Sequence, residues 1–127
     1  MPGPEPVQLS GLQLAVLRAL WEGGELSVSE VHTVVSAERD LAPTTVATLL
    51  KRLERRGVVS HRTEGRQFLY SATVTEEEAQ RSMLREVNER LFSGDLPEMV
   101  SQLLRTRDFQ SGDLERVRRM LDELKPD

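Results

Sequence analysis

Three short amphipathic segments follow one another near the start of the chain, and residues that begin or stop helices separate them. Ser10 is placed to cap the first segment, whose apolar residues recur at helical spacing until Gly23 and Gly24 interrupt the pattern. Ser27 and Glu30 have the spacing of a capping box, in which each side chain bonds an amide of the first helical turn. These helix-capping and helix-breaking residues predict two short helices before the third segment.

The third segment is the most sharply delimited of the three. Pro43 suits the first turn of a helix, helical spacing continues over Thr44–Arg56, and Gly57 stands where a left-handed C-terminal cap is expected. Two short stretches of strand character follow at residues 58–62 and 67–70, and the turn between them contains a glycine. We therefore predict three helices and then a β-hairpin.

The last third of the chain predicts three more helices. Thr75 and Glu78 form another capping box, which opens a helix that continues to about Phe92. Helical patterns follow over Leu96–Arg105 and over Ser111–Leu124, with the serine as the predicted cap of the last helix.

Apolar stripes run along these last helices, which are too short to bury them alone. The stripes must pack on one another or on a second chain, and a two-fold dimer would satisfy them. The candidate dimerisation residues are Leu84, Val87, Leu91, Val100, Leu103, Leu104, Val117, Leu121 and Leu124.

This order of elements predicts a mainly α fold with a small β-hairpin wing. A winged helix-turn-helix domain is expected over residues 9–73, because a helix pair and a hairpin follow the first helix. We expect residues 1–8, with their three prolines, to form a flexible lead. Residues 74–127 are expected to form a helical dimerisation domain.

Charge is distributed unevenly along the chain. Residues 43–70 hold six cations and two anions, a net charge of +4, whereas residues 75–127 hold nine cations and thirteen anions. On a helical wheel the leucines of the third helix lie on one side, and its threonines, lysine and arginines lie on the other. A helix with hydroxyls at its start and cations towards its end suits the major groove of DNA.

The hairpin adds two arginines, which would contact phosphates or the minor groove. A solvated surface helix would show the same polar face, but the preceding helix and the basic hairpin favour double-stranded DNA as the partner. The candidate DNA-binding residues are Pro43, Thr44, Thr45, Thr48, Lys51, Arg52, Arg55, Arg62 and Arg66.

The residue inventory argues against catalysis, cofactors and metals. The chain has no cysteine, which excludes disulfides and thiolate sites, and neither His32 nor His61 lies in a nucleophile motif or a metal-ligand pattern. No Gly-rich phosphate loop is present. No apolar run is long enough to span a bilayer, and the first ten residues lack the pattern of a signal peptide. We expect a cytoplasmic protein that is not an enzyme and does not insert into membranes.

The best-defined part of the sequence resembles a known family. The run APTTVATLLKRLERRG at residues 42–57, Gly65-Arg66, Tyr70 and the earlier LRALW at residues 17–21 are similar to the penicillinase-repressor and methicillin-resistance-repressor family. The similarity covers nearly the whole chain and is most specific from Thr44 to Tyr70.

The resemblance implies a winged-helix domain, a helical dimerisation domain and repression of resistance operons through a two-fold operator. In the best-known members, a β-lactam-sensing membrane protease releases the operator by cleaving the dimerisation domain. Their Asn-Phe cleavage bond aligns with Gln102-Leu103, which is a departure from the pattern. Copper-responsive relatives bind metal through cysteines that this chain lacks.

Two other classes stay open at this stage. A small-molecule-sensing regulator of the multiple-drug type would need a ligand pocket, which the low aromatic content disfavours. A winged helix used only as a protein-interaction module would leave the basic face without phosphate partners, and salt-sensitive DNA binding would distinguish it.

Overall fold

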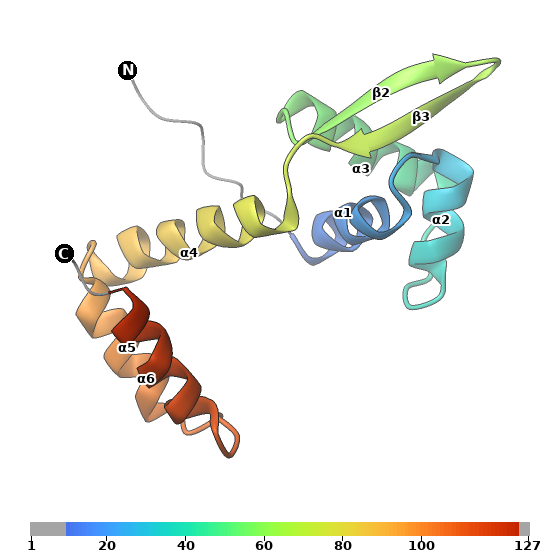
Figure 1. The fold of residues 1–127 in the computed structure, drawn as a ribbon. Helices are drawn as coiled ribbons and strands as arrows, with labels where there is room; N and C mark the ends of the chain where they lie inside the picture. The colour runs from blue at the N-terminus through green and yellow to red at the C-terminus, as the bar shows by residue number, and fades with distance from the viewer. Residues whose placement is uncertain (1–9, 125–127) are drawn as a thin grey trace. The chain divides into compact units, whose positions relative to one another are not determined.

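Side-chain caps begin the first two helices where the sequence predicts them. A computed structural model describes residues 10–124 (Figure 1), so the predicted lead at residues 1–8 lies outside the described part. Ser10 caps α1 (Gly11–Gly23), where its hydroxyl accepts the Gln13 amide at 3.1 Å and the Gln13 side chain accepts the Ser10 amide at 3.2 Å. Ser27 and Glu30 form the same reciprocal pair at the start of α2 (Val28–Ser36). Both predicted caps are confirmed.

Helix α3 (Pro43–Arg55) begins with its proline, and a glycine follows its C-terminal cap, Arg56. Gly57 has φ +83°, a left-handed conformation that costs glycine little because it has no Cβ atom. Its amide donates to the carbonyl of Glu54, and the Val58 amide donates to that of Leu53, so carbonyls of the last turn are satisfied. The chain therefore turns directly from α3 into the first hairpin strand.

The hairpin is part of a three-stranded antiparallel sheet. Strands β2 (Val59–Glu64) and β3 (Gln67–Ala72) form the predicted hairpin, and β1 (Leu26–Ser27) pairs with β3 on its other side. Strand β1 was not predicted, because two residues are too few to show an alternating pattern and one of them is the cap of α2. This strand joins the start of the helix-turn-helix segment to the wing.

The core of the first unit lies between α1, α2, α3 and the base of the sheet. Contacts divide the chain after Glu86, and the unit before this point contains a single buried cluster drawn from α1, α2, α3, β2 and β3. The eight largest fully buried side chains all belong to it: Val16, Leu17, Leu20, Val31, Val46, Leu50, Leu53 and Val59. The Trp21 indole N–H also donates to the Val74 carbonyl at 2.9 Å, which ties α1 to the segment after β3.

Helix α4 (Glu76–Phe92) begins at the predicted capping box and spans the point where the two units divide. The Glu78 amide donates to the Thr75 hydroxyl and the Thr75 amide to the Glu78 carboxylate, both at 3.0 Å. These bonds lower the pKa of Glu78. The predicted domain boundary at residues 73–74 falls in the segment between β3 and α4, and it stays a prediction.

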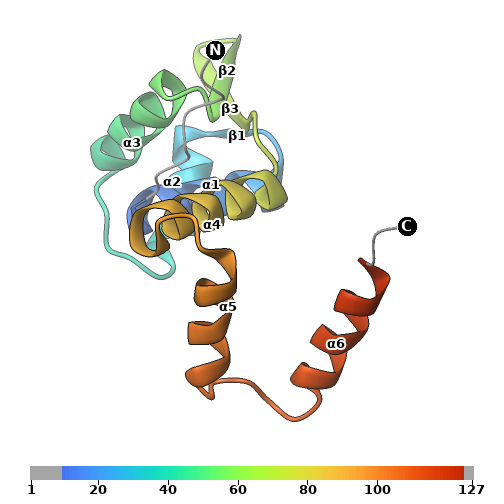
Figure 2. The same cartoon turned by 90° about the vertical axis from the view of Figure 1, so that its left-hand side faces the viewer.

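The unit after Glu86 contains α5 (Leu96–Arg105) and α6 (Asp113–Glu123), which an extended loop connects (Figure 2). Asp95 caps α5 by accepting the Glu98 amide at 3.1 Å. The prediction that Ser111 caps the last helix is wrong. The cap is Gly112, one residue later than predicted, which has φ +91° and no side chain to bond the first turn.

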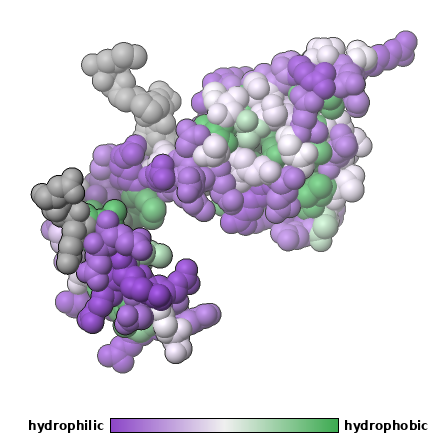
Figure 3. Space-filling model, viewed as in Figure 1, coloured by the Kyte–Doolittle hydropathy of each residue, from purple (hydrophilic) through white to green (hydrophobic). Residues whose placement is uncertain are grey.

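Apolar side chains of α4, α5 and α6 reach the surface. None of the residues of α5 and α6 is buried, and green apolar groups lie among purple hydrophilic ones in Figure 3. Within residues 10–124, no helix combines the length and the hydropathy that crossing a bilayer requires.

The buried stripe of α3 supports a stability prediction. Leu50→Ala removes a fully buried side chain and is expected to lower the free energy of unfolding by about 2–5 kcal/mol. The adjacent, exposed Lys51→Ala is the matched control, with an expected change of less than about 0.5 kcal/mol. Urea unfolding at a fixed protein concentration measures both. Equal midpoints for the two variants would contradict the packing described here.

Candidate nucleic-acid interface

Helix α3 has one buried and one exposed face, and packing fixes which is which. Val46, Leu50 and Leu53 are fully buried against the rest of the first unit. Since residues three and four apart share one face of a helix, the positions on the opposite side of α3 from these three must point outwards. The outward positions are the predicted ones: Pro43, Thr44, Thr48, Lys51, Arg52 and Arg55 are exposed, and Thr45 is half-buried at the edge.

The exposed face changes character along its length. Threonines occupy the first turns, where the Thr48 hydroxyl donates to the Thr44 carbonyl at 3.0 Å and its oxygen can still accept a hydrogen bond. Arg52 and Arg55 occupy the last turn, where positive charge also interacts favourably with the helix dipole. The face therefore offers hydroxyl groups at one end and guanidinium groups at the other.

Arg66 lies at the tip of the hairpin. Gly65 and Arg66 form the two-residue turn between β2 and β3, and Gly65 has the positive φ, +63°, that such a turn requires. Arg66 is exposed, and among residues 10–124 no carboxylate lies within ion-pair distance of it. Its guanidinium can reach a partner outside the protein.

Arg62 has a different environment from the one that the sequence suggests. Its guanidinium donates to both carboxylate oxygens of Glu25, each at 2.7 Å, and to Glu64 at 2.9 Å. Successive residues of a strand point to opposite faces, and the neighbouring His61 faces α3. Arg62 therefore lies on the face of the hairpin away from α3, bonded to two carboxylates.

A contact between the wing and α3 was not predicted. The His61 Nδ1 lies 2.6 Å from a carboxylate oxygen of Glu54 in α3, and its ring stacks on Phe68 with centroids 4.3 Å apart. Burial, together with the charge of Glu54, raises the pKa of the neighbouring Tyr70. This cluster fixes the hairpin beside the C-terminal turn of α3. The sequence shows only that side chains alternate between the two faces of β2. It does not show that His61 contacts Glu54, because the two residues belong to different elements.

The other histidine holds the turn of the helix-turn-helix. His32 in α2 bonds through Nε2 to the Leu41 carbonyl at 2.7 Å, and the same nitrogen lies 3.1 Å from the Ser36 hydroxyl. A carbonyl only accepts, so the ring must donate to Leu41. Over residues 10–124, no cluster of three or more histidine and carboxylate side chains is arranged to hold a metal ion.

The chain is similar to characterised repressors over nearly its whole length. A sequence profile of the penicillinase repressor family matches residues 9–123. The penicillinase repressor of Bacillus licheniformis is 26% identical over 93% of this chain and 92% of its own length. The methicillin resistance regulatory protein MecI of Mammaliicoccus sciuri is 20% identical over 91% of this chain and 94% of its own length.

Two solved structures of BlaI are similar to part of this chain. The DNA-binding domain of the repressor BlaI is 29% identical, covering 60% of this chain and 93% of that domain, with a TM-score of 0.53. The monomeric form of Bacillus licheniformis BlaI in complex with the blaP half-operator is 30% identical, covering 58% of this chain and 90% of that one, with a TM-score of 0.51. The winged-helix fold predicted from the sequence is thereby confirmed, and the chain belongs to the penicillinase repressor family.

Proposed function

We propose that this protein is a transcriptional repressor that binds double-stranded operator DNA through α3 and the hairpin. The observation that carries the proposal is the exposed face of α3, with threonines first and cations last, in a fold that is similar to BlaI bound to a half-operator. The fully buried opposite face leaves α3 only one orientation in which to meet a partner. In this proposal the protein acts in the cytoplasm, without a catalytic group or a cofactor.

In the proposed complex α3 lies in the major groove with its N-terminal turns deepest. Thr44, Thr45 and Thr48 would meet base edges there, beside Pro43, because hydroxyls can donate to or accept from any base. Arg52 would form the bidentate contact with guanine that a guanidinium makes best. Lys51 and Arg55 would bind the flanking phosphates, which supply affinity and register rather than sequence information.

The hairpin would contribute through Arg66 at its tip. A guanidinium at the end of a projecting hairpin can reach a phosphate or a narrow minor groove, where the potential is most negative. Such a contact adds affinity with little dependence on base sequence. The pair of His61 and Glu54 would keep the hairpin and α3 in register on the DNA.

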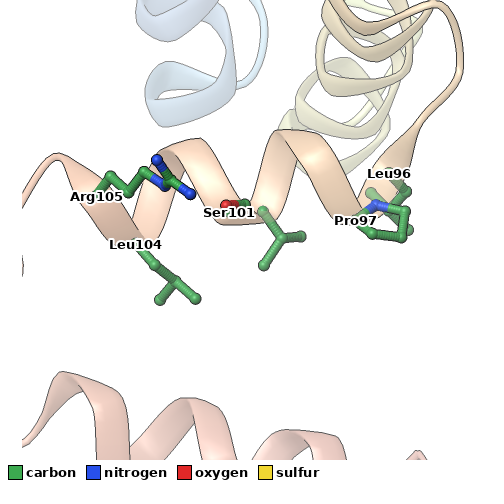
Figure 4. A pocket seen from close by; sticks show the side chains of 6 residues that line it. Leu96, Pro97, Ser101, Leu104 and Arg105 are labelled. Carbon is green, nitrogen blue, oxygen red and sulfur yellow. The ribbon is translucent and has the colours of Figure 1, made fainter.

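We propose that the last helices assemble two copies. All nine candidate dimerisation residues are exposed in the single chain, from 41% for Val87 to 76% for Leu124. A groove of about 590 Å³ lies along α5, with Pro97 and Leu104 pointing to the same side of the helix (Figure 4). A second copy would cover this apolar surface and bring a second α3 to the other half of a two-fold operator.

Proteolytic release stays a prediction. The candidate bond Gln102-Leu103 lies within α5, where the Gln102 side chain donates to Glu98 at 3.0 Å. A protease needs an extended substrate, so α5 would have to unwind locally before cleavage. A membrane-bound sensor protease is the partner that this route requires.

Two arginine variants test the DNA interface. Arg52→Ala should weaken operator binding by about 1–3 kcal/mol and relax specificity at one base pair, because a base contact is lost. Arg66→Ala should weaken binding to all duplexes alike and reduce the salt slope by about 0.9 per protomer. Fluorescence anisotropy with operator and random duplexes at several salt concentrations separates the two effects.

The control for this pair is Arg18→Ala, which removes an exposed arginine from α1, outside α3 and the hairpin. It should leave operator affinity within about twofold of wild type, since no phosphate contact is removed. If Arg52→Ala and Arg66→Ala both bind as Arg18→Ala does, the proposed interface is wrong.

A charge on the last helix tests the dimer. Leu121→Asp places a carboxylate in the apolar stripe of α6 and should yield monomers, with a loss of operator affinity greater than one added charge explains. Arg119→Asp puts the same residue on the opposite face of α6 and should remain dimeric. Sedimentation equilibrium reports the mass, and an unchanged mass for Leu121→Asp would refute the proposed interface.

A further inference from the structure

The ion pairs around Arg62 have good geometry, but they are too exposed to contribute much to the stability of the fold. Two guanidinium nitrogens meet both oxygens of Glu25, which is the bidentate geometry of a strong arginine–carboxylate pair. The hydrogen bonds between them lower the pKa of Glu25 and raise that of Arg62, so this pair is charged at neutral pH. The side chains are nevertheless 54% exposed for Arg62, 38% for Glu25 and 58% for Glu64. Ion pairs this exposed contribute little to stability.

The cluster changes the charge that the hairpin presents. Two carboxylates surround one guanidinium, so the cluster carries a net charge of −1 on an element that the sequence suggests is basic. Arg66 is then the cation that the hairpin offers to a partner. Glu25 comes from the turn between α1 and β1, far from Arg62 in sequence, and the pairing of β1 with β3 brings that turn to the sheet.

A carboxylate and a phosphate compete for the same guanidinium donors. Both accept two parallel N–H bonds in the same planar arrangement. While Glu25 and Glu64 occupy Nε and Nη2, a DNA phosphate can bind Arg62 through those donors only by displacing a carboxylate. The two carboxylates also repel the approaching phosphate.

We propose that Glu25 and Glu64 hold Arg62 away from DNA phosphates and thereby limit the electrostatic affinity of this repressor for DNA. The inference rests on the proposed function. In this proposal Glu25 limits the affinity for DNA, although Glu25 lies outside α3 and the hairpin. Because each phosphate contact adds affinity for any duplex, withholding one per protomer keeps binding more dependent on the base contacts of α3.

Two variants separate this role from a simple change of charge. Glu25→Gln releases Arg62 from its bidentate partner, so the salt slope should steepen by up to about 0.9 per protomer, with a several-fold gain in affinity for random duplex. The double variant Glu25→Gln with Arg62→Gln leaves the cluster at the wild-type charge of −1 but without its cation. It should match wild type in affinity, within about twofold, and in salt slope.

The measurement is anisotropy on the full-length protein with random and operator duplexes between low and physiological salt, after circular dichroism and thermal unfolding confirm that the variants are folded. Glu22→Gln removes an exposed carboxylate of α1 and serves as the charge control, with no change of slope expected. A double variant that binds several-fold more weakly than wild type, with a shallower slope, would show that Arg62 already binds phosphate and would overturn the inference. So would a Glu25→Gln variant that behaves like Glu22→Gln. A wild-type protein without salt-dependent DNA binding would instead overturn the proposed function.

Discussion

The burial of one face of α3 is the constraint on which the rest of the structure depends. Val46, Leu50 and Leu53 are completely removed from solvent, and each such side chain contributes about 1.5–3 kcal/mol. Rotation of α3 about its axis would expose these residues and bury arginines, which the core cannot accommodate. The outward direction of Thr48, Arg52 and their neighbours is therefore set by packing on the opposite side. Function at this surface depends on the core beneath it.

The hairpin is fixed to this core by contacts of a different kind. The left-handed Gly57 turns the chain from α3 into β2, the pair of His61 and Glu54 ties the strand back to α3, and β1 adds a third strand. These contacts are local in space but not in sequence. They give the wing a defined place beside the exposed face of α3, so that in the proposed complex both elements would contact one duplex.

Features that depend on neighbouring residues could be predicted from the sequence. The caps at Ser10, Ser27 and Thr75 occur where predicted, because a capping box needs only residues three apart. Ser111 shows the limit of such reasoning, since a left-handed Gly112 starts α6 without a side-chain cap. The outward face of α3 could also be predicted, because it follows from helical periodicity.

Features that depend on distant residues could not be predicted. The pairing of β1 with β3 brings the α1–β1 turn close to the wing, and only this topology places Glu25 against Arg62. From the sequence, Arg62 and Arg66 are equivalent cations of one hairpin. In the structure one is bonded to two carboxylates and the other faces outwards. Charge counted along a sequence therefore overestimates the positive charge available to DNA.

The most direct test of the central claim is a titration of the wild-type protein against DNA from its own upstream region, at two salt concentrations and with random duplex as competitor. The account predicts saturable, sequence-selective binding that weakens as salt increases, with two protomers on each site. Absence of DNA binding at both salt concentrations would contradict it and would favour a winged helix that serves as a protein-interaction module.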